Sequence, residues 1–382
     1  MNRRPRPRKE RGDSRVGQRF EAVVGPVAHG GHCIVRLPAP ESRVVFTRHV
    51  LPGERVILEI TEGTDGDRFW RGDAVSVLDP SPDRVAAPCP FSGPGLCGGC
   101  DFQHVTVSGQ RALKAAVVSE QLSRLAGLEL DVEVEEVPGD EEGLRWRTRM
   151  QWATTADGLR GLRAHRSRRV VPVDDCLIAQ VSAREPTPGP VIAENVLGVD
   201  FLVEPDGFWQ VHPGAPSVLV STVLSLLSPQ PGERVLDLYA GVGLFARFIA
   251  DAVGTGARVV AIEGDRPASQ HAVENLSTHE GAVVECGSVD RVLAAAYDEI
   301  FDLVVLDPPR EGAKRAVVEQ VVARAPRAVA YVACDPAALA RDVAIFAEHG
   351  YRLETLRAFD LFPMTHHVEC VALLTKSGSD LR

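Results

Sequence analysis

The sequence predicts an α/β protein in which a Rossmann-like domain follows a small β-barrel and a central α+β subdomain. After about residue 212, compact apolar strands alternate with segments long enough to form helices. This alternation is typical of a parallel, doubly wound sheet. Short strand-like segments separated by Gly and Pro occupy residues 18–79, and strand-like segments return between 128 and 204.

The length of 382 residues exceeds what one hydrophobic core normally organises, so we expect several domains. Segments rich in Pro at 81–88 ("SPDRVAAP") and 184–190 ("REPTPGP") are candidate linkers. The expected parts are a basic N-terminal tail (1–17), a β-barrel (18–80), a central subdomain (81–205) and the Rossmann-like domain (206–382).

Composition predicts a globular, cytoplasmic protein without a membrane partner. Apolar residues make up 45% and charged residues 25% of the chain. Apolar runs are far too short to cross a bilayer, and the N-terminus lacks the apolar core of a signal peptide. Eight cysteines in a reducing compartment are expected to be reduced, ligating or reactive. We take a monomer as the default.

The net charge of −10 argues against a uniformly basic nucleic-acid binder, but two segments are basic. Residues 1–20 hold seven Arg and one Lys against two acids, and we expect a disordered arm there. Residues 145–169 hold eight Arg and one acid, with Trp146 and Trp152 between them. Because Arg pairs with phosphates and aromatic rings stack on bases, this segment predicts RNA contact. A solvated pair of strands is the alternative.

Five segments between residues 18 and 79 alternate or run apolar, which predicts a small antiparallel barrel. Residues 109–126 carry apolar side chains at roughly helical spacing, which predicts a helix.

The stretch "VLDLYAGVGLFA" (235–246) predicts a strand, a glycine turn and the start of a helix. Gly241 and Gly243 allow the backbone to approach a ligand closely. Glu263 ends the next strand, where an acid can accept hydrogen bonds from a ribose. The three-glycine pattern of pyrophosphate-binding turns is incomplete, so S-adenosylmethionine fits better than NAD. A hydride-transferring Rossmann enzyme is therefore a weak alternative.

Three reactive side chains follow or enter strands of the same predicted sheet. Asp307 ends a strand in "VVLDPPREG", at the edge where open α/β sheets bind ligands. Cys334 follows the next strand and is a candidate nucleophile, with a buried structural cysteine as the alternative. Glu369 precedes an apolar run, a position that is costly for an acid unless it is paired or functional. His366 and His367 offer no convincing metal-binding set.

Cys89, Cys97 and Cys100 form a C-x7-C-x2-C pattern, and Cys176 lies far downstream. Four thiols of this kind can hold zinc or an iron–sulfur cluster, and the spacing does not distinguish them. Unligated thiols are the third possibility. Cys33, Cys286 and Cys370 are expected to be packing residues.

Together these motifs resemble the RNA 5-methyluridine methyltransferase family over nearly the whole chain. "VAHGGHCIVR" and "VLPGERV" are similar to its TRAM barrel, a small RNA-binding domain. "FWQVHP", "DLYAGVGLF", "AIEGD", "LDPPREG", "ACDP" and "HHVE" then follow in family order.

The resemblance implies transfer of a methyl group from S-adenosylmethionine to C5 of a uridine in tRNA or 23S rRNA. It implies Cys334 as the nucleophile that adds to C6, and Glu369 as the base that removes the C5 proton. The implied cofactor contacts are Gln210, Tyr239, Gly241, Glu263, Ser288 and Asp307. The four-cysteine set is implied to hold a [4Fe–4S] cluster, with zinc as the alternative. RNA cytosine-C5 methylation, or a non-catalytic RNA-binding iron–sulfur protein, are the competing functions.

Overall fold

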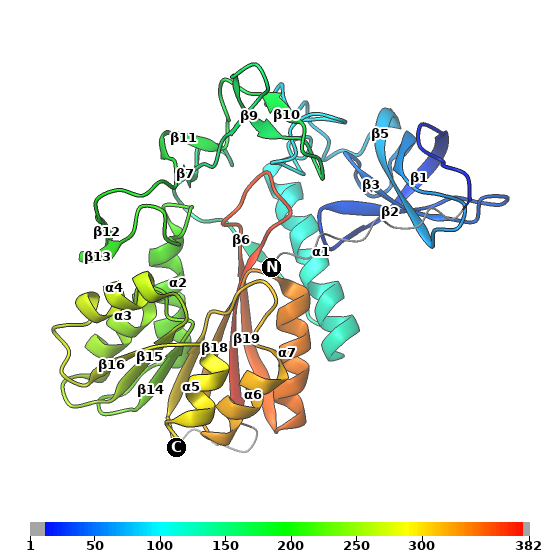
Figure 1. Ribbon diagram of the computed structural model, residues 1–382. Coiled ribbons are helices and arrows are strands. Elements are labelled where there is room, and N and C mark those ends of the chain that lie inside the picture. The colour runs from blue at the N-terminus through cyan, green and yellow to red at the C-terminus, as the bar shows by residue number, and fades with distance from the viewer. Residues whose placement is uncertain (1–11, 377–382) are drawn as a thin grey trace. The chain divides into compact units, whose positions relative to one another are not determined.

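The computed structural model describes residues 12–376, which fall into two compact units (Figure 1). The first unit contains the chain up to Leu113 together with Trp152–Cys176 and Met364–His366. The second unit contains Lys114–Gln151, Leu177–Pro363 and the chain from His367 onward. Residues of the expected central subdomain (81–205) are therefore shared between the two units. No described helix is long and apolar enough to cross a membrane.

The first unit contains the predicted barrel, closed in the order β1-β2-β3-β5-β4. Its strands are β1 (Arg19–Ala28), β2 (His32–Arg36), β3 (Val44–Arg48), β4 (Arg55–Glu62) and β5 (Phe69–Asp79). The prediction of an all-antiparallel barrel is wrong at one pair, because β3 and β5 run parallel. Closure explains this: β4 pairs antiparallel with both β1 and β5, so β5 must run in the direction of β3.

Part of the predicted N-terminal tail is bound to this barrel. Residues 1–11 lie outside the described residues. The backbone N–H of Arg15 donates to Gly63, and that of Gly17 donates to Ile60. The described end of the tail therefore adds hydrogen bonds along the edge of β4.

The rest of the first unit contains the cysteine loop (89–100) and a three-stranded sheet. The sheet has the order β10-β9-β8, with β8 (Ala153–Thr154), β9 (Arg160–Arg163) and β10 (Val170–Pro172). The loop is joined to this sheet, since the N–H of Gly98 donates to the Arg163 carbonyl at 3.0 Å. A Cβ at Gly98 would lie 2.6 Å from the backbone of His165, so only glycine allows this approach.

Smaller elements precede the main sheet of the second unit. The helix predicted at 109–126 is confirmed as α1 (Val107–Ala126). Strand β7 (Arg147–Arg149) pairs with β11 (Ala179–Arg184), and β12 (Ile192–Val196) forms a hairpin with β13 (Val199–Val203).

The second unit is built on an eight-stranded sheet in the order β16-β15-β14-β17-β18-β20-β19-β6. Its strands are β6 (Val134–Glu135), β14 (Val235–Leu238), β15 (Val259–Glu263), β16 (Ala282–Cys286), β17 (Leu303–Leu306), β18 (Ala328–Ala333), β19 (Tyr351–Phe359) and β20 (Glu369–Lys376). Strands β14 to β18 are parallel, which confirms the Rossmann-like prediction. The pattern did not reveal that β19 and β6 extend the sheet beyond β20.

Helices cover both faces of this sheet. They are α2 (Ala215–Leu227), α3 (Leu244–Val253), α4 (Arg266–Asn275), α5 (Val289–Ala295), α6 (Lys314–Ala323) and α7 (Pro336–Glu348). Val235 packs with α2 and α3, whereas its neighbour Leu236 packs with α5, α6 and α7. This alternation follows from the two-residue period of a strand.

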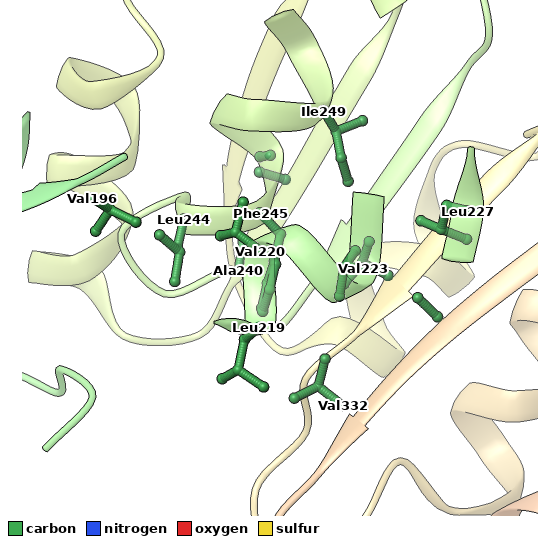
Figure 2. Packing of buried hydrophobic residues seen from close by; sticks show 14 of the residues in the cluster. Val196, Leu219, Val220, Val223, Leu227, Ala240, Leu244, Phe245, Ile249 and Val332 are labelled. Atoms are coloured by element: carbon green, nitrogen blue, oxygen red, sulfur yellow. The ribbon is translucent and has the colours of Figure 1, made fainter. Parts of the chain in front are cut away.

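Figure 2 shows the core formed by α2 and α3. Leu219 and Phe245 are buried there beside Ala240 and Val332. Burial of each large side chain is worth about 1.5–3 kcal/mol, so this core rigidly supports the neighbouring backbone. Ala240 precedes Gly241, and Val332 lies two residues before Cys334. The core therefore fixes two segments that carry predicted site residues.

Candidate active site

The predicted site residues lie at the carboxyl edge of the parallel strands. Strand β14 pairs with β15 on one side and β17 on the other, so the strand order reverses there. In doubly wound sheets, ligands bind outside the strand ends at such a reversal. Glu263 ends β15, while Asp307 and Cys334 directly follow β17 and β18.

Glu263 holds the glycine turn in place. Its carboxylate accepts hydrogen bonds from the N–H of Gly241 at 2.8 Å and from the N–H of Asp265 at 2.6 Å. Gly241 has φ +56°, and a Cβ added to it would meet no atom within 4 Å. The backbone at Gly241 thus borders open space, as a turn that admits a ligand requires. Glu263 retains further lone pairs for a ribose.

Asp237, in the middle of β14, is a site residue that we did not predict. Its side chain is fully buried and accepts from the N–H of Ala246 at 2.8 Å, which caps α3 from within the sheet. Its other oxygen has no hydrogen-bond partner among the described residues. Burial, together with the charge of Glu263, raises the pKa of Asp237 to about 7. An acid inside the apolar run "VLDL" was the available signal.

Asp307 links this acidic group to the candidate nucleophile. Burial and the nearby charges of Asp237 and Glu263 raise the pKa of Asp307 to about 7. The charge of Asp307 in turn helps to raise the pKa of Cys334 and of Glu369. The structure thus gathers three other predicted residues around Asp307, which are Glu263, Cys334 and Glu369.

Cys334 is half-buried between β18 and α7, and Glu369 is buried at the start of β20. Ala333 pairs with Cys370 in the sheet, which sets Cys334 and Glu369 beside each other on adjacent strands. Burial, and then the charges of Glu369 and Asp307, raises the pKa of the Cys334 thiol to about 12. Burial and Asp307 raise the pKa of Glu369 well above its usual range.

Arg310 is the cation that opposes these shifts, and sequence reasoning did not single it out. Its positive charge lowers the pKa of both Cys334 and Glu369. The guanidinium is exposed and contacts Nε2 of His367 at 3.3 Å. His367 also packs edge-on against Phe362. The signal that could have found Arg310 was its place directly after the two prolines of "DPPR".

The other predicted cofactor contacts, Tyr239, Ser288 and Gln210, have fewer interactions with the acidic group around Asp307. Tyr239 follows β14 with φ +65°, an uncommon conformation for a residue with a side chain. Ser288 is exposed at the N-cap of α5, and its hydroxyl donates to Asp290. Burial, and then the charge of Asp290, raises the pKa of Tyr239 to about 12, so Tyr239 and Ser288 share Asp290 as a neighbour. Gln210 is half-buried before α2, and no hydrogen bond within residues 12–376 links its side chain to them.

The four predicted cysteine ligands all lie in the first unit and are half-buried. The charges of Cys89 and Cys176 both act on Cys97, and those of Cys97 and Cys176 act on Cys100. Burial raises the pKa of Cys97, whereas the N–H of Gly99 and the charge of Arg48 lower it. Across residues 12–376, no three His, Cys, Asp or Glu side chains form a group arranged to hold a metal ion.

Two expectations about single residues need correction. Trp146 is fully buried and stacks near His212, so it cannot offer its ring to a base. Trp152 is half-buried, with the Arg160 guanidinium 3.6 Å from its ring centroid. Cys286, expected to pack, is exposed, whereas Cys33 and Cys370 are buried as predicted.

Comparisons with known proteins show the family of this chain. A family model described as tRNA (Uracil-5-)-methyltransferase matches residues 290–377, and one described as Methyltransferase small domain matches 216–331. An uncharacterized RNA methyltransferase of Streptomyces avermitilis is 43% identical, over 96% of this chain and 100% of the relative. The 23S rRNA (uracil(1939)-C(5))-methyltransferase RlmD of Pseudomonas fluorescens is 30% identical, over 95% of each. The chain belongs to the RNA 5-methyluridine methyltransferase family.

A solved structure supports the fold of this family member. The tRNA (uracil-54, C5)-methyltransferase of Pyrococcus abyssi, in complex with S-adenosyl-L-homocysteine, superimposes with a TM-score of 0.70. The match covers 93% of this chain and 100% of that chain at 23% sequence identity. This similarity shows that the two proteins share a fold.

Proposed function

We propose that this family member transfers a methyl group from S-adenosylmethionine to C5 of a uridine in tRNA or 23S rRNA. The observation that carries the proposal is the grouping of Cys334, Glu369 and Asp307 at the edge that also holds the glycine turn. A thiol, a buried base and a cofactor turn on one edge are the parts that this reaction requires. The names of the relatives point to the same substrate class.

Cys334 activates the uracil ring by attack on C6. C5 of uracil is a weak nucleophile, and a bond from sulfur to C6 moves the C5–C6 π electrons onto the C4 carbonyl as an enolate. A pKa of about 12 leaves only about one thiol in 10⁴–10⁵ ionised near neutral pH, so attack needs a proton acceptor. Asp307, with a pKa of about 7, is suited to take the thiol proton.

Glu369 completes the reaction. S-adenosylmethionine would supply an electrophilic methyl group on its sulfonium; C5 attacks this methyl group, the S–CH3 bond breaks, and S-adenosylhomocysteine leaves. Glu369 then removes the C5 proton, the C5–C6 double bond re-forms, and the Cys334 sulfur leaves as a thiolate. The raised pKa of Glu369 makes its carboxylate a stronger base, while Arg310 favours its ionised form.

The test uses labelled S-adenosylmethionine and RNA that lacks the modification. Cys334→Ala should abolish methylation, whereas Glu369→Gln should transfer the methyl group and accumulate a covalent protein–RNA adduct. Asp251→Asn changes an exposed acid near the C-terminal end of α3 and should leave activity unchanged. Full activity of Cys334→Ala would refute the nucleophile. Mapping the labelled nucleoside distinguishes uridine from cytidine and tRNA from 23S rRNA.

We also propose that Cys89, Cys97, Cys100 and Cys176 hold a [4Fe–4S] cluster. The charges of these thiols act on one another, so the four side chains are neighbours, and the positive charge of Arg48 favours the thiolate form of Cys97. Such a cluster would tie the loop at 89–100 to the residues around Cys176. Protein purified without oxygen should contain iron and sulfide and lose both when Cys97 is changed to Ser. Zinc without iron would favour the alternative metal, and colourless protein with neither would refute ligation.

A further inference from the structure

Asp342, a buried residue of α7, binds the loop that carries Arg310. One carboxylate oxygen accepts the N–H of Ala313 at 2.8 Å and the N–H of Lys314 at 3.2 Å. These groups are the first donors of α6, which has no side-chain cap of its own. Asp342 is completely buried, so the loop is joined to α7 by hydrogen bonds that water does not reach.

Tyr331 of β18 binds the same oxygen. Its hydroxyl donates to Asp342 at 2.7 Å and accepts the N–H of Ala313 at 3.0 Å. Tyr331 is also completely buried. Two elements, β18 and α7, therefore converge on one carboxylate that holds the loop.

The neighbouring residues make this attachment tighter. Arg341 donates from Nε to the second oxygen of Asp342 at 2.9 Å and from Nη2 to the Glu311 carbonyl at 2.8 Å. Gly312 has φ +75°, and a Cβ there would lie 2.6 Å from the Asp342 carboxylate. The loop backbone thus passes directly over Asp342.

The two side chains that hold the loop, Tyr331 and Asp342, lie on either side of Cys334 in the sequence. Tyr331 precedes Cys334 by three residues in β18, and α7, which carries Asp342, begins two residues after it. The loop that the two side chains hold begins directly after Arg310. The charges that change the pKa of the Cys334 thiol are those of Glu369, Asp307 and Arg310, and Arg310 is the only cation among these three.

We propose that Asp342 is a positioning residue that, together with Tyr331, fixes Arg310 against Cys334 and thereby sets the reactivity of the thiol. The role of Asp342 in catalysis rests on the proposed function, but the reactivity of the Cys334 thiol can be measured without RNA. The competing reading is that Asp342 only caps α6 and stabilises the fold.

The experiment follows alkylation of Cys334 by iodoacetamide over a range of pH, read by mass spectrometry of the Cys334 peptide. Arg310→Gln, Asp342→Asn and Tyr331→Phe should each slow alkylation at a fixed pH by about three- to tenfold, a shift of the thiol pKa of up to about one. Tyr331→Phe removes one hydroxyl and is the mildest change.

The double variant Arg310→Gln/Asp342→Asn decides between the two readings. Since both changes act through one guanidinium, the double variant should react no more slowly than Arg310→Gln alone. Asp251→Asn, which changes an exposed acid of α3, should alkylate like the unchanged protein.

A simple cap would lower the melting temperature of Asp342→Asn and Tyr331→Phe while leaving Cys334 alkylation unchanged. That result, or additive effects in the double variant, would overturn the proposal. Methylation by Cys334→Ala would instead refute the proposed function and leave the alkylation result standing.

Discussion

S-adenosylmethionine should bind more tightly as the pH rises toward 7, because the cofactor edge holds acids that are protonated in mildly acidic solution. Burial raises the pKa of Asp237 and of Asp307 to about 7, and Glu263 contributes to both shifts. The cofactor carries a sulfonium and an ammonium group, and a nearby cation favours ionised carboxylates. Binding should therefore release protons from this acidic group.

The size of the effect follows from the number of protons released. Below pH 7, each proton lost on binding raises the affinity about tenfold per pH unit, or about 1.4 kcal/mol. Asp237 and Asp307 interact, so they titrate as a pair and together release between one and two protons. Affinity should rise by about ten- to a few-hundredfold from about pH 5.5 to 7 and become constant above about pH 8.

Calorimetry in two buffers of different ionisation enthalpy counts the released protons directly. S-adenosylhomocysteine lacks the sulfonium charge and should release fewer protons than S-adenosylmethionine. Asp237→Asn should lower the count for S-adenosylmethionine, and the exposed control Asp251→Asn should not. Equal counts in the unchanged protein and Asp237→Asn, or an affinity that falls as the pH rises, would refute the reasoning.

Three further predictions concern stability and RNA binding. In urea unfolding, the unchanged protein should lose up to about 4 kcal/mol more stability than Asp237→Asn as the pH rises from about 4 to 7. The reason is that Asp237 keeps its proton in the folded state, whereas the unfolded chain releases it near pH 3.8. Parallel plots of stability against pH for the two proteins would contradict this. Arg166→Ala/Arg168→Ala removes two exposed cations of the β9–β10 turn and should reduce the slope of log affinity for RNA against log salt by about two, with an unchanged slope arguing against contact there. Phe245→Ala should cost about 3–5 kcal/mol in the same unfolding assay because it empties the core of Figure 2, and a loss below about 1 kcal/mol would show that the core collapses around it.

The residues whose position at the edge of the sheet could be predicted are those whose sequence signals are local. Asp307 and Cys334 follow apolar strands, and parallel strands bring their carboxyl ends together, so chain order alone was enough to predict their proximity. Asp342 and Arg310 act through contacts between a loop and a distant helix, which no local pattern contains. Trp146 was misread because alternation with Arg does not say which side of the segment packs inward.

The barrel shows the same limit at the level of topology. Its five strands could be read from alternation and turn residues, but the parallel pairing of β3 with β5 arises only when the barrel closes. Likewise, β6 has two residues and no distinguishing pattern of its own. It is a strand because Ala358 and Phe359 of β19 lie alongside it.

The interleaving of the two units has a consequence for synthesis on the ribosome. Strand β6 is made early, yet its partner β19 emerges more than two hundred residues later. The barrel-containing unit likewise lacks Met364–His366 until the chain is almost finished. Neither unit is complete while the nascent chain is still short, so the first should depend on emergence of Met364–His366 and the second on the final strands. A transcript truncated before Met364 would therefore yield two incomplete bodies, and no intact half.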